Sequence, residues 1–244
     1  MAIGFGVSLG VGALFWPRGA GALMRRSLAT AYTRGAEYLA AAVHQVIRGA
    51  DATGARRQAR AAGDRLDDAF RQYLSELSGN RARLEDVATL LAGATRLRLA
   101  AYSLSTLAGL SDGSPGRERL RRTLDHEGRR LRSWYVALGD SIVEARRPPA
   151  PDDGDRDGPL RLLGYAREPV ARDSGSGAAL ALMLLWASQD LANLRRLEVD
   201  LVGPAGELAG HPPEKRYAEG PGPADRAFRA TADWSRRRPR RAAS

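Results

Sequence analysis

The residue types in this chain that could do chemistry are three histidines and three pairs of adjacent acidic residues. His44, His126 and His211 are far apart in the sequence, and none lies in a metal-binding pattern such as HExxH. Adjacent side chains on a helix point in different directions, and no base or metal ligand is spaced to act with the acidic pairs. We interpret all of these residues as surface, core or capping residues, and we expect no catalytic and no metal site. The acidic pairs are Asp67-Asp68, Glu85-Asp86 and Asp152-Asp153.

The sequence also contains neither a cysteine nor a phosphate-binding loop motif. The chain has no cysteine, which excludes disulfides, thiolate catalysis and cysteine metal sites and agrees with a reducing compartment. The glycines near the N-terminus are not followed by GKS or GKT and do not follow a strand, so they do not form a phosphate-binding loop. We therefore expect no cofactor and no enzymatic activity.

The chain is strongly basic, with a formal net charge of +10. Lys215 is the single lysine among 38 basic residues, a bias that we attribute to GC-rich coding rather than to function. Much of the charge lies near the C-terminus, in RRRPRR at residues 236–241. No helix-turn-helix, zinc finger or aromatic stacking platform accompanies it, so we expect anionic membrane lipid as its partner and no specific nucleic acid.

Helical periodicity dominates the chain, and strand patterns are nearly absent. Apolar residues at helical spacing predict a helix at about 20–48 with Leu23 on its stripe, a second that ends at 78–80 with Leu74 on its stripe, and further helices at about 84–110, 117–146 and 178–202. The stripe of the 117–146 helix consists of Leu120, Leu124, Leu131, Tyr135, Leu138 and Ile142. We predict an all-α fold in which long helices pack as a cytoplasmic bundle through their apolar faces. The stretches around 148–177 and after 203 are rich in Pro, Gly and charge, which is typical of linkers and disordered tails. The predicted organisation is a truncated end of a transmembrane helix at 1–17, a helical region at 18–147, a linker or long loop at 148–177, a closing helix at 178–203 and a disordered basic tail at 204–244.

An apolar run occupies residues 2–16 and predicts the end of a membrane helix. It offers about 15 of the roughly 20 apolar residues that a span requires, so it either lies shallowly or lacks a part. The positive charge follows the run rather than preceding it, which argues against a secretory signal. Trp16 suits the membrane interface, and Arg18, Arg25 and Arg26 place the following chain in the cytoplasm by the positive-inside rule.

Two glycines in this run have the spacing of a membrane packing motif. Gly6 and Gly10 form a GxxxG pair, and such small residues let membrane helices approach closely. We therefore expect this segment to pack against further membrane helices. The alternative that stays open is a Gly-rich disordered N-terminus or a buried core helix, since Gly is a poor helix former in water.

Several sequence blocks resemble a known family. They are FWPRGA at the end of the apolar run, LDDAFRQYL, GATRLRL and, later, ALMLLWASQDLANLRRLE. Together they are similar to the region that follows the last membrane helix of the N-terminal bundle in actinobacterial members of the FUSC family, the fusaric acid resistance and aromatic acid exporter-like proteins. The resemblance covers most of the chain up to about Leu201.

The resemblance implies an inner-membrane efflux transporter of small aromatic or organic acids with a helical cytoplasmic region. Only the last part of the membrane bundle is represented here, so we expect a fragment or short form that serves assembly or gating and does not transport alone. Its implied partners are membrane lipid and either other transmembrane helices of the same transporter or further copies of itself. The alternative is an independent membrane-associated helical adaptor without transport activity.

Overall fold

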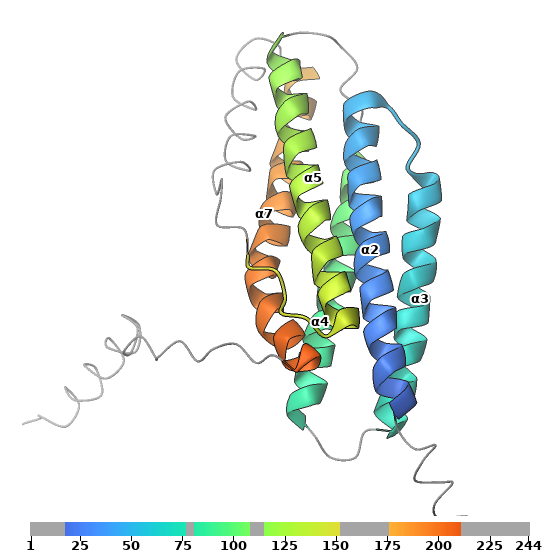
Figure 1. Ribbon diagram of the computed structural model, residues 1–244. Helices are drawn as coiled ribbons and strands as arrows, with labels where there is room; N and C mark the ends of the chain where they lie inside the picture. The colour runs from blue at the N-terminus through green and yellow to red at the C-terminus, as the bar shows by residue number, and fades with distance from the viewer. Residues whose placement is uncertain (1–17, 77–80, 108–114, 152–175, 211–244) are drawn as a thin grey trace, which may run out of the picture. The chain divides into compact units, whose positions relative to one another are not determined.

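The computed structural model describes residues 18–76, 81–107, 115–151 and 176–210, which form a five-helix bundle (Figure 1). No strand occurs within these ranges, so the predicted all-α fold is confirmed. The helices are long, and their predicted positions agree with the structure to within a few residues at most ends. They are α2 (Arg18–Arg48), α3 (Thr53–Glu76), α4 (Arg81–Ser105), α5 (Pro115–Glu144) and α7 (Ser176–Ala209).

The helix that follows the apolar run, α2, makes the most extensive contacts with the rest of the bundle. It packs against α3, α4 and α5, while α7 packs against α4 and α5 on the side away from α2. All five helices contribute to one hydrophobic core, and α3 joins it through the face that packs on α2 and α4. The bundle is thus built around the helix that follows the apolar run in the sequence.

The core explains why these segments are helical. In α5 the apolar residues recur at the spacing of one helix face, and every member of that predicted stripe is buried. Leu23 in α2 and Leu74 in α3 were also expected on apolar stripes, but each is 42% exposed. The buried residues of the α5 stripe are Leu120, Leu124, Leu131, Tyr135, Leu138 and Ile142.

Two buried tyrosines connect α2, α4, α5 and α7 within the core. The hydroxyl of Tyr32 in α2 donates to the carbonyl oxygen of Leu90 in α4 at 2.7 Å. The hydroxyl of Tyr135 in α5 donates to the carbonyl oxygen of Leu194 in α7 at 2.9 Å. The two rings stack on each other with centroids 6.0 Å apart. Burial raises the pKa of both tyrosines, which keeps the hydroxyls protonated as donors.

The closing helix is longer than the sequence analysis expected. It was predicted to end at residue 203, but α7 continues to Ala209 with Pro204 inside it. The reason is packing, since Leu201, Ala205 and Ala209 follow one another at a spacing of four residues and are all buried. At the predicted linker, Pro148 is buried and the carbonyl oxygen of Ala150 accepts a hydrogen bond from Trp134 Nε1 at 2.9 Å, so the chain is still packed at this point. Residues 152–175 and 211–244 lie outside the described residues.

Glycine allows a close approach between α4 and its neighbours. A Cβ atom built on Gly93 would lie 2.7 Å from Leu201 Cδ2 and 2.7 Å from the Tyr32 hydroxyl oxygen. The tyrosine cannot give way easily, because its hydroxyl is hydrogen-bonded in the core. Gly93 is therefore required by packing, although glycine lowers the intrinsic stability of a helix.

We predict opposite effects for two glycine-to-alanine substitutions. Gly93→Ala should lower the free energy of unfolding by about 1–3 kcal/mol, because it overpacks the core. Gly21→Ala, in α2 with no atom within 4 Å of the new methyl group, should raise it by up to about 1 kcal/mol through helix propensity. Urea denaturation of both variants checks this, and effects of the same sign would contradict the packing described for Gly93.

Candidate functional site

The predicted membrane-interface residues lie in or before the first turns of α2. Trp16 and the glycine pair Gly6 and Gly10 lie outside the described residues. Arg18 is the first residue of α2, and Arg25 and Arg26 follow in the next turns of the same helix, Arg26 exposed and Arg25 half-buried. Within the ranges that the structure describes, no helix is both long enough and apolar enough to cross a membrane.

The histidines and acidic pairs are not brought together in the described part of the chain. His44 Nε2 lies 3.4 Å from Asp125 Oδ1 between α2 and α5, whereas His126 is on α5 and His211 is not described. Asp67 and Asp68 are exposed on α3. No group of three or more potential metal ligands occurs among the described histidines and carboxylates.

One acidic pair lies close to a third carboxylate at the end of the bundle. Burial raises the pKa of Asp86 in α4, and the negative charges of Glu207 in α7 and Glu85 raise it further. The sequence placed Glu85 and Asp86 on a solvated face, but it gave no sign of Glu207 beside them. This proximity depends on the extension of α7 beyond residue 203.

A buried ion pair connects α5 and α7. Glu127 of α5 is fully buried, and its Oε2 accepts a hydrogen bond from a terminal nitrogen of Arg195 in α7, whose side chain is 11% exposed. A second carboxylate, Glu198, is buried on α7 and is close enough to Tyr135 to contribute to raising its pKa. Buried charges of this kind persist only when they are paired.

Sequence reasoning missed this ion pair although the sequence contained a signal for it. Glu127 lies three residues after Leu124 and four before Leu131, which places it inside the predicted apolar stripe of α5. Glu198 lies four residues after Leu194 and three before Leu201, on the buried face of α7. A charged residue at an apolar stripe position is therefore a useful indication of a buried pair.

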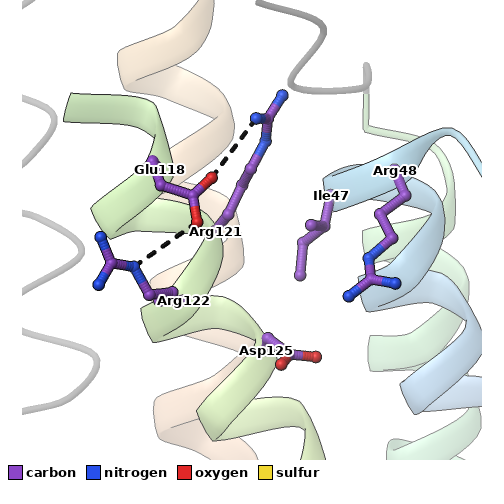
Figure 2. A pocket seen from close by; sticks show the side chains of 6 residues that line it. All are labelled: Ile47, Arg48, Glu118, Arg121, Arg122 and Asp125. Carbon is purple, nitrogen blue, oxygen red and sulfur yellow. Dashed lines mark ion pairs between the residues drawn. The ribbon is translucent and has the colours of Figure 1, made fainter. Parts of the chain in front are cut away.

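A shallow pocket of about 370 Å³ lies where the end of α2 faces the start of α5 (Figure 2). Figure 2 shows Glu118 between Arg121 and Arg122, with ion-pair distances of 3.7 and 3.6 Å. Asp125, at the lower edge, pairs with Arg129 at 2.8 Å. Both carboxylates of the pocket are already paired with arginines, so most of its charged groups belong to a surface ion-pair network.

The larger hollow is a groove of about 580 Å³ between α4 and α7. Its floor is apolar, and charged side chains from both helices lie along it. Asp190 of α7 is half-buried within it, and its Oδ2 atom is buried without a hydrogen-bond partner in the described part of the chain. The residues of the α4–α7 groove are Arg96, Leu99, Ala100 and Ser103 from α4, and Asp190, Asn193, Leu194, Arg196, Leu197 and Asp200 from α7.

The ionisation of Asp190 should make stability depend on pH. Burial raises the pKa of this carboxyl, and a hydrogen bond with Ser103 partly opposes the shift. A carboxyl with a raised native pKa adds stability below its unfolded pKa, and this contribution is lost as the pH rises through the native value. We therefore expect Asp190→Asn to raise the melting temperature more at about pH 7 than at about pH 4. An equal change at both pH values would contradict this, and Asp140→Asn at an exposed position of α5 is the matched control.

The described residues establish the fold as an all-α five-helix bundle, and the grooves add no finer class of protein. The chain matches no protein-family model, no curated protein and no solved structure.

Proposed function

We propose that this chain is the cytoplasmic helical portion, in fragment or short form, of a FUSC-like inner-membrane efflux transporter of small aromatic or organic acids. In this role it assembles or gates the membrane part and does not transport alone. Its partners are membrane lipid and either other transmembrane helices of the same transporter or further copies of the chain. The observation that carries the proposal is the position of α2, which begins at Arg18 directly after the apolar run and packs against three other helices.

The packing of α2 supports a mechanical connection between a membrane segment and the bundle. A closely packed interior transmits displacement rather than absorbing it, because its side chains interdigitate with few voids. Tyr32 of α2 is hydrogen-bonded to α4 and stacked on Tyr135 of α5. A rotation or shift of the start of α2 would therefore reach α4 and α5 through fixed contacts.

The basic residues at the start of α2 support placement next to a membrane surface. Arg18 and Arg26 are separated by a helical rise of about 12 Å, so both lie within reach of a surface at the start of the helix. Each basic residue near an anionic leaflet contributes on the order of 1 kcal/mol. These arginines would stabilise an orientation in which the first turns of α2 face the lipid.

The second candidate, a membrane-associated adaptor, is favoured by one surface feature. Leu182, Leu185 and Trp186 on α7 are each at least half exposed and are neighbours at helical spacing. Exposed apolar clusters of this kind occur at protein interaction sites. In this reading the bundle binds a partner protein through α7, with no transporter involved.

Fractionation of cells expressing the full chain tests membrane attachment in both readings. We expect the chain in the inner-membrane fraction and retained after an alkaline carbonate wash, and a variant lacking residues 2–16 released into the supernatant. A variant with glutamine at Arg18, Arg25 and Arg26 should remain attached but be removed more easily by salt. Recovery of the full chain in the supernatant would contradict the proposal.

A further inference from the structure

The α4–α7 groove has two chemically different ends. The helices run in opposite directions, because Ser103 hydrogen-bonds Asp190 at one end while Gly93 approaches Leu201 at the other. The side chains that line the groove therefore extend from Ser103 and Asp190 towards Arg96 and Asp200. Ser103 and Arg96 are seven residues apart on one helix, which corresponds to about 10 Å of helical rise.

The Asp190 end of the groove carries an acidic group. Asp190 Oδ2 is buried and accepts no hydrogen bond within the described residues. The half-buried Asp190 side chain lines the groove, so an ammonium group entering here would pair with its carboxylate.

The opposite end has an excess of positive charge. Arg96 and Arg196 stand against a single carboxylate, Asp200, and all three side chains are exposed. Guanidinium groups bind carboxylates through paired hydrogen bonds, and their planar geometry favours this anion. The end at Arg96 and Arg196 is therefore suited to a carboxylate.

An apolar surface connects the two ends. Leu194 and Leu197 are buried in the floor, and Leu99 is 56% exposed at the side of the groove. The volume of about 580 Å³ is in the range of small-molecule sites. An aliphatic chain lying between the charged ends would cover this surface.

We propose that the α4–α7 groove binds a linear aliphatic zwitterion about 10 Å long, such as an ω-amino acid. Its ammonium group pairs with the Asp190 carboxylate, its methylene chain lies on Leu99, Leu194 and Leu197, and its carboxylate binds Arg96 and Arg196. This binding role goes beyond the membrane role proposed above and does not depend on it.

Calorimetric titration of the full chain with ω-aminooctanoate tests the proposal, with octylamine and octanoate as single-ended analogues. We expect the zwitterion to bind at least about tenfold more tightly than either analogue. Asp190→Asn and Arg96→Gln should each weaken its binding by about tenfold. Arg132→Gln, an exposed position on α5 outside the groove, is the matched control and should leave binding unchanged. Far-UV circular dichroism establishes that each variant is folded.

Specific outcomes would overturn the proposal. Absence of binding at millimolar ω-aminooctanoate would do so, as would octylamine binding as tightly as the zwitterion while Arg96→Gln has no effect. If Asp190→Asn does not fold, Leu99→Glu replaces it, because this side chain is exposed and its substitution should not disturb the core. Unchanged binding to folded Leu99→Glu would equally overturn the proposal. Because the readout is binding in solution, its failure is separate from a failure of the membrane proposal.

Discussion

Arg195→Met is expected to lower the free energy of unfolding by about 3–5 kcal/mol, because it leaves a buried carboxylate without its cation. Glu127 is fully buried, and Arg195 is its ion-pair partner. Glu198 is also buried, three residues after Arg195 on α7, so the substitution removes positive charge from its surroundings as well. Chemical denaturation followed by circular dichroism measures the loss.

The matched control for this prediction is an exposed ion pair on the same helix as Glu127. Arg122 pairs with Glu118 at 3.6 Å, but the two side chains are 72% and 51% exposed. Arg122→Met should therefore change the free energy of unfolding by less than about 1 kcal/mol. In the Arg195→Met background, Glu127→Leu should recover part of the loss, since it removes the unpaired charge. Equal effects of the two arginine substitutions would show that the pair is not buried as described.

Tyr135→Ala is expected to lower the free energy of unfolding by about 3–5 kcal/mol, because it removes a large buried side chain at the contact of three helices. The ring stacks on Tyr32 and meets Trp134 edge-on at 5.0 Å. Tyr135→Phe keeps these ring contacts and loses only the hydrogen bond to Leu194, which should cost about 1 kcal/mol. Urea denaturation of the two variants measures ring packing and hydrogen bond separately.

An exposed tyrosine provides the control for Tyr135. Tyr102 on α4 is 44% exposed and lies under the guanidinium of Arg56, 4.6 Å from the ring centre. Tyr102→Ala should cost about 1 kcal/mol, the value of an exposed cation–π contact. If Tyr135→Ala costs no more than this, the tyrosine pair does not hold the four helices together.

The helices of this fold could be predicted from the sequence because their apolar periodicity is regular. The stripe of α5 is the clearest example, since all its predicted members are buried. The end of α7 could not be predicted in this way, because glycine and proline at positions 203 and 204 are typical of a helix end. Burial of Ala205 and Ala209 extends the helix, and that burial depends on tertiary packing.

The grooves and the buried ion pair were not predicted, for a different reason. Periodicity shows which face of a helix is apolar, but it does not show which two helices become neighbours. Asp190 and Ser103 are far apart in the sequence, and only the packing of α4 on α7 brings them together. The membrane-interface role of Trp16, Arg18, Arg25 and Arg26 depends on the apolar run. This run lies outside the described residues, so the role stays a prediction.

The most direct test of the central proposal is to identify the native polypeptide that contains this bundle. Its coding region upstream of Met1 is sequenced, and the native protein is analysed by peptide mass spectrometry of the inner-membrane fraction. A FUSC-like transporter predicts that peptides of this chain occur in one membrane-bound polypeptide together with several preceding apolar segments. A native protein that starts at Met1 and is recovered outside the membrane fraction would contradict the proposal.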